Sequence, residues 1–172
     1  DDKGVELLVK YTAYQSDNGA FRAIRPFANA TYSKFKYEDF KIQRLGTPAT
    51  TVTTTDYSNN PVAGVAPWVV NGGIDIMAAG GLYANVVYNY KDAMPFTSDN
   101  VNRTSSYSLL NAKLGIQQSF AGHFNLDAFF GVNNITHTKY PLMVFVNQLP
   151  DAYLAGPNKA NYFGGINLKY NF

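Results

Sequence analysis

The sequence predicts an all-β fold built from the antiparallel, up-and-down strands of a transmembrane β-barrel. About seven stretches alternate apolar and polar side chains over roughly 10–14 residues, whereas strands of soluble proteins average about 5–6 residues. The connections between these stretches are alternately short and long. The last stretch keeps its alternation up to the C-terminal residue, Phe172. Strands of this length suit a bilayer, which about 9–11 tilted residues can cross.

The terminal stretch, 161–172, shows the alternation most clearly. Its apolar set, with the intervening positions mostly polar, is Tyr162, Gly164, Ile166, Leu168, Tyr170 and Phe172. Because successive side chains of a strand point to opposite faces, this strand has one apolar face. Aromatic residues at both ends of that face suit the two interfaces of a bilayer. The alternative is an ordinary amphipathic strand of a soluble sheet.

The first part of the chain predicts two strands and their connections. Residues 4–14 alternate, and residues 15–20 contain the Asp, Asn and Gly that tight turns require. Residues 21–44 form a long strand-like stretch whose alternation changes phase near residues 25–26, where we expect a bulge or a sheet edge. Residues 45–67 are rich in Thr, Pro, Asn and Gly and predict a long irregular loop.

The rest of the chain continues the pattern. Further strands are predicted at 68–78, 82–90, 107–120, 124–135 and 161–172. The short connections of the whole chain are 15–20, 79–81 and 121–123, and the long ones are 45–67, 91–106 and 136–160. Strict alternation places all tight turns at one end of the strands and all long loops at the other, as in transmembrane barrels.

An odd number of strands does not close a bacterial barrel, because such barrels normally have even strand counts and lipid cannot satisfy an open edge. We therefore expect residues 1–172 to be the C-terminal portion of a larger barrel.

Other functions have little support: a net charge of +2 without basic clusters argues against nucleic acid. Two His and no Cys provide no metal site, no nucleophile–base arrangement suggests an enzyme, and no cofactor is expected.

Four segments resemble TonB-dependent receptors. Residues 63–68 (AGVAPW) are similar to their Gly-Val-Pro segment, and residues 107–115 (YSLLNAKLG) to a stretch of the form Y-x-L-L-N-A-K-L-G. Residues 131–140 (GVNNITHTKY) resemble their G-x-N-N-[LI]-x-x-x-K-Y motif, and the chain ends in Tyr170-Asn171-Phe172. The resemblance covers about residues 60–172 and, more weakly, residues 4–14.

This resemblance implies a 22-stranded barrel of the bacterial outer membrane, filled by an N-terminal plug and surrounded by lipid. Such receptors take up scarce small molecules, most often ferric siderophores or other iron complexes, and TonB drives the uptake. No plug and no TonB box lie in these residues, so contact with TonB belongs to an N-terminal part absent here. The terminal Ile166, Leu168, Tyr170 and Phe172 correspond to the signal that the barrel-assembly machinery reads. The alternative is a smaller structural or adhesion barrel without transport.

Ligand recognition is expected in the long loops, and above all in 136–160. Its stretch 140–153 (YPLMVFVNQLPDAY) is unusually apolar and aromatic for a loop. Aromatic side chains give a large contact area for few frozen torsions, so Tyr140, Phe145 and Tyr153 are the predicted ligand contacts, with Met143 and Asn147 as further candidates. His137 and Lys139 favour an anionic ligand. The alternative is that this stretch packs against neighbouring loops.

The apolar face of the strands is expected to contact lipid. The residues predicted to point into the bilayer are Leu7, Val9, Val86, Tyr88, Leu114, Leu126, Phe130 and Leu168.

Overall fold

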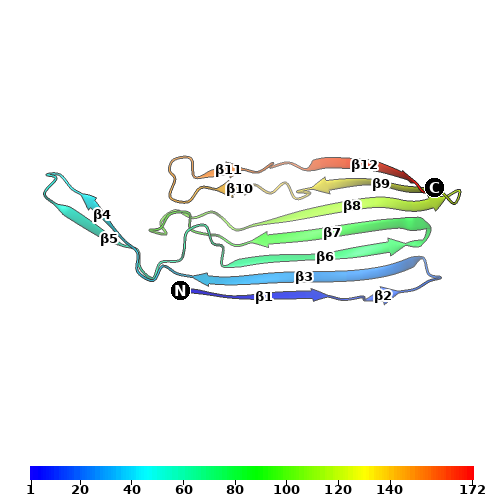
Figure 1. Cartoon of the computed structure of the whole chain (residues 1–172), viewed down its shortest axis with the longest axis horizontal. Helices are drawn as coiled ribbons and strands as arrows, with labels where there is room; N and C mark the ends of the chain where they lie inside the picture. The colour runs from blue at the N-terminus through cyan, green and yellow to red at the C-terminus, as the bar shows by residue number, and fades with distance from the viewer.

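The computed structural model describes residues 1–172 and shows an all-β protein dominated by one antiparallel sheet (Figure 1). The strands follow one another through the sheet in the order β1-β3-β6-β7-β8-β9-β12, and β2 extends β1 along the same edge of β3. Their bounds are β1 (Asp2–Lys10), β2 (Tyr14–Gln15), β3 (Phe21–Phe35), β6 (Trp68–Ala78), β7 (Leu82–Lys91), β8 (Tyr107–Phe120), β9 (Phe124–Asn133) and β12 (Asn161–Tyr170). The sheet is open, with β1 and β12 at its edges.

The predicted sorting of the connections is confirmed. The tight turns after β2, β6 and β8 all lie at one end of the sheet (Figure 1). The turn after β6 is the 3-10 segment Ala79–Gly81, and no helix of the structure is long and apolar enough to cross a membrane. At the opposite end lie the first (36–67), second (92–106) and third (134–160) long connections.

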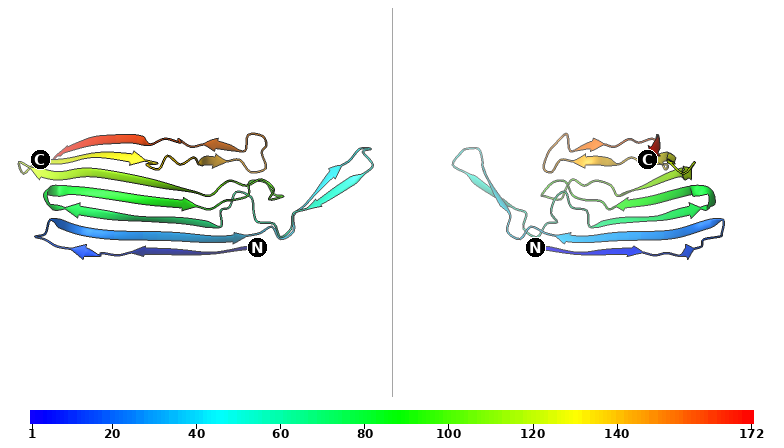
Figure 2. Two further views of the ribbon diagram at one scale, coloured as in Figure 1. Left: turned by 180° about the vertical axis from the view of Figure 1, so that it is seen from behind. Right: turned by 45° about the vertical axis from the view of Figure 1, so that its right-hand side comes forward.

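Two details of the first half differ from the sequence prediction. The strand predicted over 21–44 ends at Phe35, and a separate hairpin follows, formed by β4 (Lys41–Leu45) and β5 (Val52–Asp56). This hairpin projects away from the sheet (Figure 2). The Thr-rich run suggested a loop by its composition, but threonine is β-branched and favours strands once a partner pairs with it.

The expected irregularity near residues 25–26 is also displaced. The register shift of β3 lies between Phe21 and Ala23 instead. Pro26 stays in register opposite Ile74, and its carbonyl accepts a hydrogen bond from the Tyr11 N–H at 3.1 Å. The strand thus runs through Pro26 without a break, and the proline carbonyl still accepts a backbone hydrogen bond.

The eight residues predicted to face lipid do share one face, which we call the apolar face. The cross-strand registers align Val9, Ala28, Gly72 and Tyr88 in one row, and Ala84, Leu114, Phe130 and Gly164 in another. Many apolar side chains here are more than half exposed, such as Leu114 at 62% and Leu168 at 60%. An exposed apolar surface of this extent marks a contact surface for lipid or another molecule.

Aromatic residues mark both ends of the apolar face. Near the tight turns, the rings of Phe120 and Phe124 stack with centroids 5.4 Å apart, and Tyr170 lies 5.1 Å from Phe124. Near the long connections, the Tyr32 and Trp68 rings lie 4.8 Å apart. Aromatic groups at both ends of an apolar strand face are typical of the interfacial girdles of a membrane barrel.

On the opposite face, which we call the polar face, glycines within the strands make room for aromatic rings. A Cβ atom on Gly73 would meet the ring of Phe27 at 2.5 Å, and one on Gly165 would meet the ring of Phe129 at 2.8 Å. Glycine therefore lets an aromatic ring from the neighbouring strand lie across the backbone.

The best-packed part of the molecule lies outside the sheet. Of the 11 buried residues, only Ala23 and Gly131 belong to its strands. The others lie in the three long connections: Ala63, Ala66, Met94, Pro95, Phe96, Thr97, Ser98, Asn134 and Ala152. A single sheet without a second layer buries neither face, so the core forms where the connections pack on one another.

Candidate ligand-binding site

Ser98 joins the three long connections. Its side chain is buried, and its N–H donates to Oδ1 of Asn147 at 2.8 Å, while Nδ2 of Asn147 donates to the Ser98 hydroxyl at 2.9 Å. Nδ2 of Asn60 donates to the Ser98 carbonyl at 2.9 Å, and the Tyr37 hydroxyl lies 3.3 Å from the Ser98 hydroxyl. Asn147, a candidate ligand contact in the sequence, thus bonds to another loop. The three connections form one hydrogen-bonded unit.

Gly64 allows the first connection to approach the other two. Its N–H donates to the Pro95 carbonyl at 2.7 Å, and its φ is +85°, a conformation that side chains rarely adopt. A Cβ atom at this position would lie 2.9 Å from Cγ2 of Val146 in the third connection. The Gly-Val segment noted in the sequence therefore has a packing reason.

Asp99 orders the second connection beside Ser98. Its carboxylate accepts hydrogen bonds from the Thr97 hydroxyl and from the Val101 N–H. These bonds, the Thr97 hydroxyl first, hold the pKa of Asp99 below its ordinary value. The ionised carboxylate is therefore the form that keeps this turn ordered.

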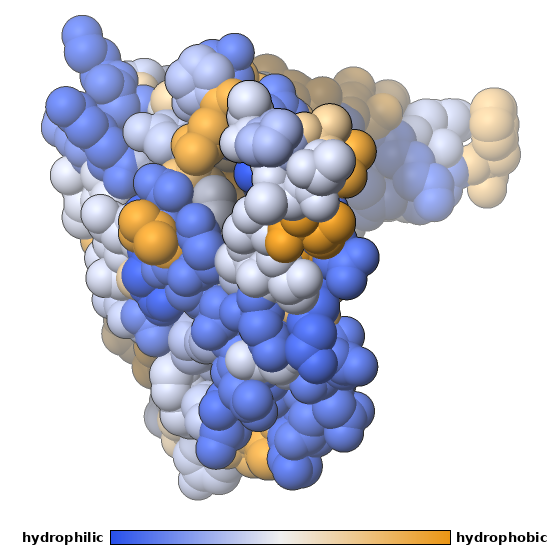
Figure 3. All heavy atoms as spheres, turned by 90° about the vertical axis from the view of Figure 1, so that its left-hand side faces the viewer, coloured by the Kyte–Doolittle hydropathy of each residue, from blue (hydrophilic) through white to orange (hydrophobic).

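A groove of about 490 Å³ lies between the second and third connections. Its lining residues are Arg103, Thr104, Ser105, Lys139, Tyr140, Pro141, Tyr153, Ala155, Gly156 and Asn158. Two of them are cationic and none is acidic, so the groove favours an anion. Seen from the end of the sheet that carries the connections, the surface is mostly hydrophilic with separate hydrophobic patches (Figure 3).

Two of the three predicted contact residues line this groove. Tyr140 is half-buried, with its ring 5.4 Å from that of Tyr107 and its carbonyl accepting from the Gly156 N–H at 2.9 Å. A Cβ atom on Gly156 would lie 2.4 Å from the Tyr140 ring, so glycine makes room for it. Tyr153, at the start of β11 (Tyr153–Ala155), is 56% exposed.

Phe145 does not line the groove. It directly follows β10 (Pro141–Val144), which pairs with β11, and its N–H donates to the Ala152 carbonyl at 2.8 Å. Arg103 is the cationic groove residue that the sequence did not reveal. It lies in a different connection from Tyr140, and no sequence spacing relates the two; only the folded chain brings them together.

The polar face carries a second group of polar side chains near the tight turns. The Tyr83 hydroxyl donates to Asp127 at 2.9 Å, and Asn85 donates to Asp75 at 2.6 Å. Nζ of Lys113 lies 5.4 Å from the centroid of the Tyr83 ring, within the range of a cation–π contact. These neighbouring strands present polar and charged side chains on this face.

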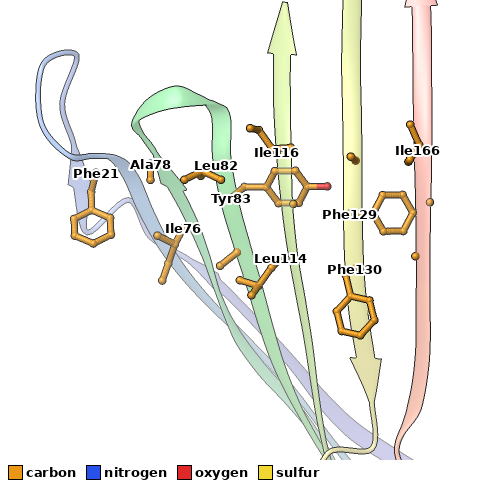
Figure 4. A pocket seen from close by; sticks show the side chains of 15 residues that line it. Phe21, Ile76, Ala78, Leu82, Tyr83, Leu114, Ile116, Phe129, Phe130 and Ile166 are labelled. Carbon is orange, nitrogen blue, oxygen red and sulfur yellow. The ribbon is translucent and has the colours of Figure 1, made fainter.

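A larger hollow of about 1060 Å³ lies across the strands near the tight turns (Figure 4). Its lining is mostly apolar and includes Ile76, Leu114, Phe130 and Ile166. No charged group lines it. It is therefore part of the apolar contact surface, with no side chain suited to recognise a charged ligand.

The four predicted assembly residues lie at the end of the chain as their alternation requires. Ile166, Leu168 and Tyr170 lie on the apolar face of β12, directly opposite Ala128, Leu126 and Phe124 of β9. Phe172 follows the strand and is fully exposed, with its ring 5.1 Å from that of Tyr170.

Long antiparallel strands, one continuous apolar face and sorted connections define the wall of a membrane β-barrel. The chain belongs to the family described as TonB dependent receptor-like, beta-barrel, whose model matches residues 3–135. This confirms the resemblance inferred from the motifs.

A solved structure supports the fold. The siderophore receptor PiuA from Acinetobacter baumannii matches with a TM-score of 0.72 at 15% sequence identity, over 97% of this chain and 22% of its own chain. This chain therefore spans about a fifth of that protein. No curated protein matches the sequence.

Proposed function

We propose that this chain forms part of the wall and outer loops of an outer-membrane receptor, which takes up an iron complex of the siderophore type by a TonB-dependent route. Membership of the receptor barrel family supports the receptor role. The structural neighbour is by its name a siderophore receptor, and the chain shares its fold. Coupling to TonB would belong to other parts of the whole receptor.

In this proposal the apolar face contacts lipid and the polar face lines the barrel interior. The long connections then lie outside the cell, and the tight turns face the periplasm. The barrel-assembly machinery would read the exposed ring of Phe172 together with the apolar residues that precede it. The proposed role is binding and transport rather than catalysis.

The observation that carries the proposal is the groove between the second and third connections. Its volume of about 490 Å³ lies within the usual range of small-molecule sites, roughly 300–1,000 Å³. Arg103 and Lys139 supply positive charge, and Tyr140 and Tyr153 supply aromatic surface. A siderophore brings its own iron ligands, so the receptor needs to contact only the exterior of the complex, which is the chemistry that this groove offers.

Uptake and binding by cells that produce the full-length receptor test the proposal. Variants Arg103→Ala, Tyr140→Ala and Tyr153→Ala are compared at matched receptor levels, with ferric citrate and a ferric catecholate as probes. Loss of one aromatic contact should weaken binding about threefold to tenfold. Phe145→Ala is the control from the same connection, because Phe145 lies outside the groove.

The expected result is weaker binding of at least one probe in the three groove variants and a smaller effect of Phe145→Ala. Unchanged binding of both probes in all three groove variants would refute a role for the groove. A receptor without transport, the structural or adhesion alternative, would take up neither probe even at full surface abundance.

A further inference from the structure

Asn134 is the most deeply buried polar residue of the chain. It follows directly after β9, in the G-x-N-N segment noted in the sequence, and is 2% exposed. Its φ is +53°, which asparagine tolerates better than most residues. A buried amide needs partners for all its polar atoms, so the contacts of Asn134 indicate what it does.

The Asn134 side chain binds both ends of the third connection. Its Nδ2 donates to the Thr138 carbonyl and to the Pro157 carbonyl, each at 2.9 Å. Its Oδ1 accepts from the Thr138 N–H at 2.9 Å. Both amide hydrogens and the oxygen are thus used, and the two ends of the connection are held against one side chain.

Asn134 is itself hydrogen-bonded to the sheet. The Asn134 N–H donates to Oδ1 of Asn111 on β8 at 2.9 Å. Asn111 donates to Asn89 at 2.9 Å, Asn89 to Asn71 at 2.6 Å, and Asn71 to Asn29 at 2.7 Å. This asparagine row crosses β8, β7, β6 and β3 on the polar face, and the side-chain amides of Asn111, Asn89 and Asn71 all donate in the same direction.

Thr138 and Pro157, the two residues that the Asn134 side chain binds, are each close in sequence to a residue that lines the candidate groove. Tyr140 follows Thr138 by two positions, and Gly156 precedes Pro157 directly. The Gly156 N–H bonds to the Tyr140 carbonyl, and the Tyr140 ring lies over the Gly156 backbone. Fixing Thr138 and Pro157 therefore fixes Tyr140 against Gly156.

We propose that Asn134 is a positioning residue, which ties both ends of the third connection to the asparagine row and so holds Tyr140 in place at the groove. Asn134 does not line the groove and acts only through the residues it binds. The consequence for ligand affinity rests on the proposed function; the consequence for the order of the connection does not.

Hydrogen exchange in the purified full-length receptor tests this role. Asn134→Gly removes the amide while keeping a residue that accepts positive φ. Loss of a buried hydrogen-bond partner should speed exchange at the Thr138 amide about tenfold to a hundredfold. The matched control is Asn133→Ala, because Asn133 is adjacent but exposed, and its side chain forms no hydrogen bond.

Asn134→Asp is the second variant, in case Asn134→Gly fails to insert. It keeps the acceptor for the Thr138 N–H but cannot donate to the Thr138 or Pro157 carbonyls. Exchange should then rise around residues 155–160 and less at Thr138. Unchanged exchange throughout 136–160 in the variants that insert would overturn the proposal. An equal rise within β8 and β9 would also overturn it, because Asn134 would then support the fold in general.

Binding of ferric citrate and of a ferric catecholate is measured on the same samples. Weaker binding together with faster exchange supports positioning of the groove. If Tyr140→Ala leaves binding of both probes unchanged while Asn134→Gly still loosens the connection, the groove function fails and the positioning role stands.

Discussion

Replacing Leu114 with arginine should destabilise the receptor strongly, because Leu114 lies at the middle of β8 on the apolar face. Its side chain is 62% exposed, and its cross-strand neighbours are Ala84 and Phe130, so no polar partner is within reach. An arginine on the lipid face near the bilayer midplane costs about 2–4 kcal/mol. This corresponds to a shift of roughly thirtyfold to a thousandfold in the folding equilibrium.

Asn85→Arg is the control at the same depth on the other face. Asn85 is paired in register with Lys113, the neighbour of Leu114, and lies on the polar face beside Asp75. An arginine there can pair with the Asp75 carboxylate, so a change below about 1 kcal/mol is expected.

The assay is a urea titration of the full-length receptor refolded in lipid vesicles, with heat-modifiable mobility on gels as the measure of folded barrel. The free energy of unfolding should fall much more in Leu114→Arg than in Asn85→Arg. Equal losses in the two variants would show that the assignment of the faces is wrong.

Three further outcomes are expected. Deleting Phe172 should sharply lower the amount of receptor in the outer membrane while leaving the stability of inserted receptor nearly unchanged, since its ring lies beyond β12 and is fully exposed; normal surface levels would contradict this. Gly64→Ala should destabilise the packing of the long connections by about 1–3 kcal/mol, because alanine is strained at a φ of +85° and would crowd Val146. The rate of chymotrypsin cleavage in these connections measures the destabilisation, and an unchanged rate would refute it. The Asp99 carboxylate, whose pKa lies below the ordinary 3.8, should stabilise the second connection fully above that value and lose this effect as the pH falls through the lower pKa of the folded state. Proteolysis by pepsin at about pH 2 and pH 4, corrected for the activity of pepsin at each pH, measures this, and Asp99→Asn should reduce the difference between the two pH values that wild type shows.

The alternation in the sequence is enough to predict the seven long strands of the main sheet, their two faces and the sorting of the connections. A period of two along a strand is a local property, so the alternation in 161–172 or 107–120 was enough to place Leu168 and Leu114 on one face. The tight turns were equally local, because a few residues of suitable type form them. The glycines at 73 and 165 make room for the rings of Phe27 and Phe129, and these ring positions are known only from the structure.

The packing of the long connections and the position of the groove follow only from the folded chain. The Thr-rich run became β5 because β4 pairs with it, a partner that its own composition does not specify. Asn147 was equally suited by type to contact a ligand or another loop, and the position of Ser98 settled which. Arg103 and Tyr140 share a groove although they belong to different connections. Loops have no periodicity that fixes their direction, so their contacts follow from the mutual packing of distant segments and cannot be obtained from any one of them.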